Sequence, residues 1–425
     1  MLRGVKQMIL IKHADIFDGK HRELQKNKNL VITDQLVTDI FDGEVSEERF
    51  EQVIDAKGKT AIPGLTDAHV HFGHTFIPGA ELDYDIVVSA TVAKKLLYQG
   101  FTTVRDAGGV TGGIKKAIDQ GVIEGPRIYP SNAHISQTCG HGDSKRAHEL
   151  REIQYKIPTA GVLADGRDEV IRAVREQLFL GASQIKLMAG GGCASECDPV
   201  QTVQFTEDEM RAAVETASDY GTYVMAHLYT AESMKRAAKA GIKSFEHAHL
   251  LDEEVAKMAA DQGIFITPMP QFSQKECELS HIGDLGRPRE EWEAPKKDKS
   301  KDLREALQRA TELIKKYSLK VLFGTDLMIT WPFYDPRDSY DLTQYKKRFG
   351  SFEGLLAATG NVNDLIKLTT YQNPYPDGEI GVLKVGSYAD LLLVDGNPVE
   401  DLDILADSNH LQFIMKDGKI YKNTL

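Results

Sequence analysis

The stretch that decides the fold reads Ala61-Ile62-Pro63-Gly64-Leu65-Thr66-Asp67-Ala68-His69-Val70-His71. Its apolar first part, interrupted by glycine, is typical of a buried strand. His69 and His71 are two positions apart, so on a strand their side chains project to the same face. Two imidazoles on one face can hold a metal ion from one side, although a pair of solvated or core-paired histidines would show the same spacing.

The composition describes an ordinary globular protein with an acidic surface. The chain has 425 residues, of which 41% are hydrophobic and 27% are charged, and its formal net charge is −12. An acidic balance argues against nucleic acid and against anionic membranes as partners, so we expect a small-molecule substrate. The apolar run Met8–Ile11 is too short for a signal peptide or a membrane span, and we therefore predict a cytoplasmic protein.

Four cysteines in a chain of this length do not make a disulfide framework. Cys193 and Cys197 stand in a C-x3-C spacing without a second pair, so the sequence favours free thiols over a structural zinc site.

Eight short apolar segments alternate with amphipathic helical segments over most of the chain. The predicted strands are Ile62–Val70, Phe101–Arg105, Arg127–Pro130, Gln184–Met188, Thr222–His227, Lys243–His247, Ile264–Thr267 and Lys320–Phe323. Eight β-then-α units predict a (β/α)8 TIM-type barrel of parallel strands with helices outside. A doubly wound open sheet is the alternative, but no G-x-G-x-x-G turn follows an early strand.

Helix signals fall between these strands. Thr206-Glu207-Asp208-Glu209 is a capping box, and Gly221 ends the helix that follows it. Further helices are predicted over Asp168–Leu180 and Asp252–Gln262, each followed by a glycine. The charged segment Arg289–Lys316 is too long for a plain loop and predicts a helix plus a lid, with a solvated surface helix as the alternative.

The two ends of the chain differ from its middle. Residues 1–60 and 379–425 hold short β-type segments separated by turn residues, and neither end is long enough to form a core alone. We predict that the two ends together form one small β-sandwich domain, and that residues 61–378 form the catalytic barrel.

Residues of metal-ligand type stand at the ends of five predicted strands. Taken singly, each could be a core histidine, a lysine that extends toward solvent, or a helix cap. Together they lie where a barrel of this kind builds its active site, at the carboxyl ends of the strands. The six residues are His69, His71, Lys186, His227, His247 and Asp326.

This pattern resembles the amidohydrolase superfamily of metal-dependent barrel hydrolases over nearly the whole chain. The motifs that carry the resemblance are PGLTDAHVH at 63–71, the strand-end residues above, GTD at 324–326 and KVGSYADL at 384–391. SQTCGHGD at 136–143, MAGGG at 188–192 and HLYT at 227–230 are similar to the branch of imidazolonepropionase-like proteins, Xaa-Pro dipeptidases, metal-dependent carboxypeptidases and ochratoxin-hydrolysing amidases.

The resemblance implies two divalent metal ions, with zinc expected and manganese, cobalt or iron as alternatives. It assigns His69, His71 and Asp326 to the first ion, His227 and His247 to the second, and a carboxylated Lys186 as the bridge between them. The modification is needed because a lysine ammonium cannot ligate a cation, whereas a carbamate is anionic and offers one oxygen to each ion.

The resemblance also implies roles for other residues of the site. Asp326 would take the proton of the attacking hydroxide and pass it to the leaving amine. His141 follows the third predicted strand and is a candidate oxyanion donor, or alternatively a loop histidine with a local hydrogen bond. Tyr229 lies two residues after His227 and could bind a substrate carboxylate, or alternatively only pack at the rim.

We therefore expect a binuclear-metal hydrolase that cleaves an amide or peptide bond of a small substrate, such as an Xaa-Pro dipeptide or an N-acyl amino acid. The alternatives are a cyclic-amide hydrolase of the imidazolonepropionase type, a mononuclear deaminase, against which Lys186 argues, and a metal-free scaffold protein, against which the complete ligand set argues. Relatives are commonly homo-oligomers, so we expect the same here. The aromatic-rich segment Trp331–Tyr340 and the cysteines leave the substrate open.

Overall fold

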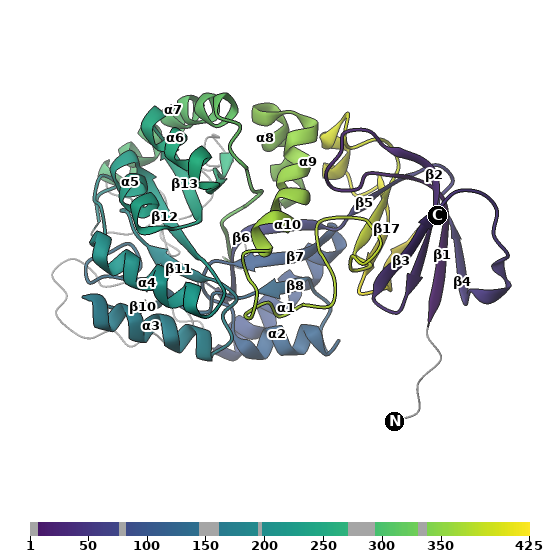
Figure 1. The fold of residues 1–425 in the computed structure, drawn as a ribbon, viewed down its shortest axis with the longest axis horizontal. Helices are drawn as coiled ribbons and strands as arrows, with labels where there is room; N and C mark the ends of the chain where they lie inside the picture. Colours follow the sequence, from purple (N-terminus) through teal and green to yellow (C-terminus); the bar gives the residue numbers. More distant parts are fainter. Residues whose placement is uncertain (1–6, 76–81, 144–160, 194–197, 271–293, 330–337) are drawn as a thin grey trace.

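A computed structural model describes residues 7–75, 82–143, 161–193, 198–270, 294–329 and 338–425 of the chain. It contains one sheet built from both ends of the chain, and two parallel sheets with helices around them (Figure 1). Among the described residues, no helix is both long enough and apolar enough to cross a membrane.

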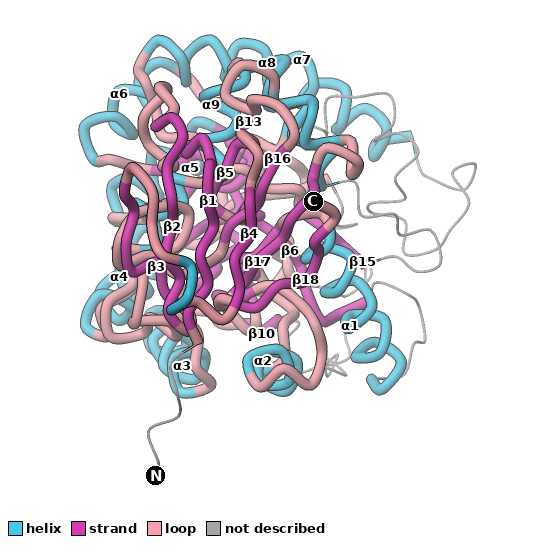
Figure 2. The backbone as a smooth tube through the Cα atoms, turned by 90° about the vertical axis from the view of Figure 1, so that its right-hand side faces the viewer, coloured by secondary structure: helices cyan, strands magenta, loops and turns pink. Residues whose placement is uncertain are grey.

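The sheet at the chain ends, called here the terminal sheet, has eight strands. Seven lie in the order β18-β17-β16-β5-β1-β2-β3, and β4 pairs with β1. Figure 2 shows this sheet facing the viewer. Its strands are β1 (Met8–Ile16), β2 (Gln25–Thr33), β3 (Leu36–Phe41), β4 (Gln52–Asp55), β5 (Thr60–Pro63), β16 (Leu391–Val394), β17 (Leu411–Lys416) and β18 (Lys419–Asn423). The antiparallel pair of β5 and β16 joins the two ends, while the predicted sandwich and its boundaries stay predictions.

The middle of the chain forms the two parallel sheets. One has the order β15-β6-β7-β8, and the other has the order β10-β9-β11-β12-β13-β14. The strands are β6 (Leu65–Thr75), β7 (Phe101–Asp106), β8 (Arg127–Tyr129), β9 (His134–Ser136), β10 (Gly161–Leu163), β11 (Ile185–Met188), β12 (Val224–Thr230), β13 (Ser244–Leu250), β14 (Phe265–Thr267) and β15 (Leu327–Ile329).

Backbone hydrogen bonds connect these two sheets at both of their junctions. The segment 320–326 lies between β14 and β6, because Leu322 N donates to Ile266 O (2.8 Å) and Ala68 N donates to Phe323 O (2.8 Å). At the other junction, Ser183 N donates to Pro130 O just beyond β8 (2.7 Å). The two parallel sheets are thus hydrogen-bonded to each other at two places.

Helices follow the strands along the chain and lie outside them (Figure 1). They are α1 (Leu82–Tyr98), α2 (Gly112–Asp119), α3 (Arg167–Phe179), α4 (Glu207–Asp219), α5 (Ala231–Ala240), α6 (Glu253–Gln262), α7 (Ala294–Lys316), α8 (Asp338–Phe349), α9 (Ser351–Ala357) and α10 (Gly360–Ile366). The predicted capping box is present at Thr206 and Glu209, and Gly263 ends α6 in the left-handed region at φ 63°. Most of the segment Arg289–Lys316, predicted as a helix plus a lid, is α7, and residues 289–293 lie outside the described residues.

Two of the predicted strands are wrong in detail. The predicted strand Ile62–Val70 is two strands. Gly64 N still donates to Asp390 O beside β16 (2.9 Å), and directly after it the chain passes from the terminal sheet into β6. Gly64 is required at this crossing, since a Cβ there would lie 2.1 Å from the Thr102 hydroxyl. The predicted strand Lys320–Phe323 divides its hydrogen bonds between two neighbours and forms only an isolated bridge, Ile266 to Val321.

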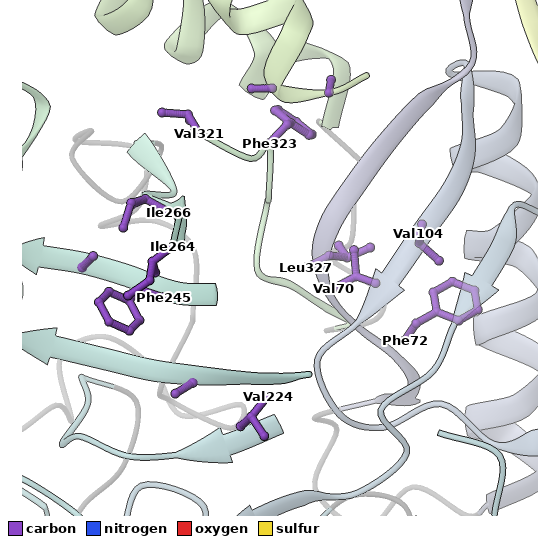
Figure 3. Packing of buried hydrophobic residues seen from close by; sticks show 14 of the residues in the cluster. Val70, Phe72, Val104, Val224, Phe245, Ile264, Ile266, Val321, Phe323 and Leu327 are labelled. Atoms are coloured by element: carbon purple, nitrogen blue, oxygen red, sulfur yellow. The ribbon is translucent and has the colours of Figure 1, made fainter. Parts of the chain in front are cut away.

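The hydrophobic core extends from the parallel sheets into the terminal sheet. Figure 3 shows part of the larger cluster, in which Phe72, Phe245 and Phe323 come from separate strands and segments. On β16 the side chains alternate, as a strand requires: Leu392 and Val394 belong to this cluster, whereas Leu391 and Leu393 belong to the core of the terminal sheet. β16 thus contributes side chains to both hydrophobic cores.

Replacement of Leu393 tests this arrangement. Leu393 is fully buried in the core of the terminal sheet, so we expect Leu393→Ala to lower the free energy of unfolding by about 2–5 kcal/mol. Hydrogen exchange should quicken first in β1, β5 and β17. As a control, Leu393→Met conserves volume and should cost less than about 1.5 kcal/mol. Equal exchange in both variants would contradict this assignment of the core.

Candidate metal centre

Three buried side chains converge beside the middle of β6. His69 Nε2 lies 3.3 Å and His71 Nε2 lies 3.2 Å from the same atom, Asp326 Oδ1. The ligand atoms of the three residues all lie within 4.8 Å of one another. Two imidazoles and a carboxylate are a donor set that suits zinc and similar divalent ions, so these residues fit a metal.

The second nitrogen of each imidazole is held by the protein. His69 Nδ1 lies 2.7 Å from Glu246 Oε2, and His71 Nδ1 lies 2.9 Å from Gly108 O. A carboxylate and a carbonyl can only accept, so both rings carry their hydrogen on Nδ1. Each Nε2 is therefore left with its lone pair toward the other ligands, as a metal requires.

Lys186 of β11 reaches the same place. Its Nζ lies 3.3 Å from His69 Nε2, and the side chain is buried. Burial lowers the pKa of Lys186 to about 8, against the opposing effect of the nearby Glu246 and Asp326 carboxylates. This amine is therefore uncharged more often near neutral pH than a solvated lysine is.

His227 of β12 and His247 of β13 complete the group. Their rings lie 4.5 Å apart, and the His247 ring lies 5.6 Å from that of His69. Burial holds the pKa of both histidines well below its usual value, which keeps the rings neutral. The structure thus brings all six residues predicted as ligands into one buried region, although their role as ligands stays a prediction.

The carboxylate of Asp326 is fixed from two sides. Burial acts to raise its pKa, but the neighbouring side chains of His69 and His71 outweigh burial and hold the pKa well below the usual value. Asp67 connects β6 to the segment 320–326, since its Oδ1 accepts from His69 N (3.0 Å) and from Thr325 N (3.2 Å). Asp326 itself has φ 54°, a left-handed conformation that is uncommon outside glycine.

Sequence reasoning missed an ion pair beneath the site. The Arg105 guanidinium donates from Nη2 to both oxygens of Glu246, at 2.9 and 3.1 Å, and both side chains are fully buried. Burial disfavours both charges, but their attraction prevails: the pKa of Glu246 lies well below and that of Arg105 above the usual values. Charges of opposite sign inside two predicted apolar strands were the signal that could have revealed this pair.

The two predicted substrate-binding residues line the same region. The His141 ring is stacked on that of His227, with centroids 4.1 Å apart and planes 18° apart. The Tyr229 ring is stacked on His247 at 4.8 Å, and burial together with the neighbouring Cys193 raises the pKa of Tyr229 well above its usual value. Tyr229 therefore stays a neutral phenol. The predicted Cys197 and most of the aromatic-rich segment 331–340 lie outside the described residues.

Another histidine of this region was not predicted. His249 lies two residues after His247, and its ring is 5.2 Å from that of Tyr229. Burial lowers its pKa to about 3, so the ring is neutral and adds a further polar group to the region.

Comparison with known proteins identifies relatives along the whole chain. The profile of the amidohydrolase family matches residues 60–421. An ochratoxinase from Aspergillus niger is 29% identical over 447 aligned residues, which cover 97% of this chain and 87% of that protein. A crystal structure of a prolidase complexed with N-methylphosphonate-L-proline is 30% identical, with a TM-score of 0.88 and coverage of 98% of this chain and 100% of that one.

A crystal structure of a Xaa-Pro dipeptidase with methionine bound in its active site is 28% identical, with a TM-score of 0.85 and coverage of 98% of this chain and 100% of that one. The resemblance inferred from the sequence motifs, including its branch, is thereby confirmed.

Replacement of Glu246 tests the role of the buried pair. Glu246→Gln keeps the shape but removes the charge that holds Arg105 and His69, so we expect metal affinity to fall about 10–100-fold, as is typical for groups that orient a ligand. Metal content after competition with a chelator measures this loss. The matched variant Glu254→Gln changes an exposed carboxylate of α6 and should retain the wild-type affinity. Equal affinities in the two variants would rule the role out.

Proposed function

Because this chain belongs to the amidohydrolase family, and is accordingly a hydrolase of amide or peptide C–N bonds, we propose that it cleaves such a bond in a small substrate with the help of two divalent metal ions. The substrate that fits best is a dipeptide such as Xaa-Pro, or an N-acyl amino acid. The names of the prolidase, the Xaa-Pro dipeptidase and the ochratoxinase support this range of substrates.

One observation carries the proposal: a buried lysine amine lies beside the histidines and the aspartate that are predicted to bind metal. Lys186 Nζ is 3.3 Å from His69 Nε2, and that nitrogen is in turn 3.3 Å from Asp326 Oδ1. A bare ammonium at this position would repel a cation. A carbamate of Lys186 instead carries a negative charge and two ligand oxygens, and it explains why a lysine stands here.

The predicted ligands would have separate roles. His69, His71 and Asp326 would hold one ion, His227 and His247 the other, and the Lys186 carbamate would lie between the two ions. When bound, such ions lower the pKa of water and polarise a carbonyl group. Asp326 would accept the proton of the attacking water at its carboxylate and deliver it to the nitrogen of the leaving amine.

Two further residues would bind the substrate. His141, stacked on His227, stands beside the proposed ligands and would donate to the oxyanion that forms during attack. Tyr229 stays a neutral phenol, and its hydroxyl would donate to the carboxylate on the leaving side of the substrate.

The wider context of the enzyme belongs to the same proposal. The two parallel sheets would close into one (β/α)8 barrel across residues 61–378. Residues 1–60 and 379–425 would form a composite domain against it. Zinc is the metal we expect first, and manganese, cobalt or iron would suit the same ligands. A homo-oligomer in the cytoplasm is the form in which we expect the enzyme to act.

Replacement of the bridging lysine tests the carbamate. Lys186→Ala should lose most of the activity and much of the metal, and short carboxylic acids should restore part of both, because they supply the missing oxygen ligands. Metal analysis and rates with and without added acetate or propionate measure this. Lys316→Ala, at an exposed position of α7, should behave as wild type. A loss of activity that no carboxylic acid restores, with both metals retained, would contradict the bridge.

The substrate class is tested with a dipeptide and its C-terminal amide. A hydrogen bond to a charged group contributes about 1.5–3 kcal/mol, so we expect the free dipeptide to have roughly 10–100-fold higher kcat/KM in the metal-reconstituted enzyme. Tyr229→Phe should remove most of this preference, whereas Tyr220→Phe, at an exposed position, should keep it. Equal efficiency for acid and amide in the wild type would instead favour a neutral or cyclic substrate.

A further inference from the structure

A short antiparallel segment after β11 carries two buried polar side chains toward His141. Residues 198–205 turn back along the end of β11, where Gly191 N donates to Thr202 O (3.0 Å) and Gln204 N donates to Ala189 O (3.1 Å). Gly190 and Val203 form a bridge within this pair. The segment is therefore fixed by backbone hydrogen bonds to the strand that supplies Lys186.

The two polar side chains, Asp198 and Gln204, are bonded to each other. Gln204 Nε2 donates to Asp198 Oδ2 (3.0 Å), and Gly192 N donates to the same oxygen (2.9 Å). Asp198 is 2% exposed and Gln204 is 1% exposed. A buried carboxylate with two donors has a fixed position, so its contact with a third group also has a fixed direction.

That third group is His141, which this pair holds at two points. Gln204 Oε1 accepts from the backbone N of His141 (2.8 Å), which fixes the loop. Asp198 Oδ2 lies 3.4 Å from His141 Nδ1, which fixes the ring. Because a carboxylate can only accept, the Nδ1 atom that faces it carries a hydrogen.

Gly192 leaves the space that the ring needs. A Cβ at this position would lie 1.9 Å from His141 Cε1 and 2.1 Å from Nδ1. Any side chain here would have to displace the ring from its stack on His227. The absence of a side chain at Gly192 and the carboxylate of Asp198 thus favour the same ring position.

We propose that Asp198, supported by Gln204 and Gly192, is a positioning residue: it holds the ring of His141 against His227 with hydrogen on Nδ1, so that the Nε2 edge is presented to the substrate. The role of His141 in turnover rests on the proposed function. The position of its ring does not. Asp198 acts through His141 and need not touch the substrate.

The first test is kinetic. Asp198→Asn keeps the volume but offers an amide that can accept or donate, so the orientation of His141 is no longer unique. We expect kcat to fall about 10–100-fold with little change in KM, as for groups that orient a catalytic residue. Gly192→Ala should produce the same loss by displacing the ring. The double variant with His141→Phe and Asp198→Asn should differ in kcat by less than about twofold from His141→Phe alone, because the effects of coupled residues do not add.

The second test does not depend on turnover. In zinc-loaded protein labelled with 15N-histidine, long-range 1H–15N spectra report which ring nitrogen carries hydrogen, and the signals of His141 are identified by their loss in His141→Phe. We expect hydrogen on Nδ1 in the wild type and a changed pattern in Asp198→Asn. The control is Asp165→Asn, which removes an exposed carboxylate that holds Thr138 of the same loop, and it should change neither spectrum nor kcat.

The outcomes separate the two proposals. If the wild type cleaves no amide or peptide bond, the proposed function fails, and the spectra still decide the position of the hydrogen. If Asp198→Asn leaves the His141 pattern unchanged, or if its effect on kcat adds in full to that of His141→Phe, Asp198 does not position His141. Should Asp198→Asn fail to fold, an unchanged His141 spectrum and rate in Gly192→Ala would overturn the inference in the same way.

Discussion

The buried pair of Arg105 and Glu246 is the interaction on which the site depends. Removing two charges from water costs several kcal/mol for each ion, and the attraction between them compensates only when the geometry is good. Here the geometry is good, since Arg105 binds both oxygens of Glu246 and also donates from Nε to Ala68 O (2.6 Å). Glu246 in turn accepts from Ser244 Oγ (2.6 Å). Every strong hydrogen-bonding group of the pair is thus occupied.

Such a pair adds little to the stability of the fold, because replacing it by apolar side chains of similar volume often leaves stability unchanged or raises it. The pair instead fixes the orientation of the groups around it. Glu246 Oε2 fixes the tautomer and the plane of His69, and the Ala68 carbonyl held by Arg105 immediately precedes that histidine. The pair therefore holds His69 by its ring and by its backbone. His69 Nε2 is the atom that both Lys186 Nζ and Asp326 Oδ1 approach.

The sequence predicted those parts of the site that follow from strand geometry. His69 and His71 could be placed on one face because side chains alternate along a strand, and the ends of parallel strands lie together, so the other four residues were expected nearby. Arg105 and Glu246 were missed because charged residues in apolar strands have no pattern of their own. Their partnership spans 141 positions and becomes visible only after folding.

The errors in the fold have a similar origin. The residues on both sides of Gly64 are apolar, so sequence periodicity could not show that the chain passes there from one sheet to another. That crossing depends on Asp390, far along the chain. The strands β9 and β10 have three residues each, too few for any periodicity to be visible. No sequence pattern singled out Asp198, and only its tertiary contacts distinguish it from a surface carboxylate.

The same crossing at Gly64 shows why the terminal sheet matters to the site. Asp390 O accepts from Gly64 N, and the Asp390 carboxylate accepts from Arg127 Nε (2.9 Å) at the start of β8. The terminal sheet thus holds the chain just before the start of β6, five residues before His69. It also holds β8, which is separated from β6 by β7. Within β6, Asp67 accepts from His69 N and from Thr325 N, which precedes the left-handed Asp326. A strained residue persists only where its surroundings determine it, and here contacts with the strand that carries the histidines determine Asp326.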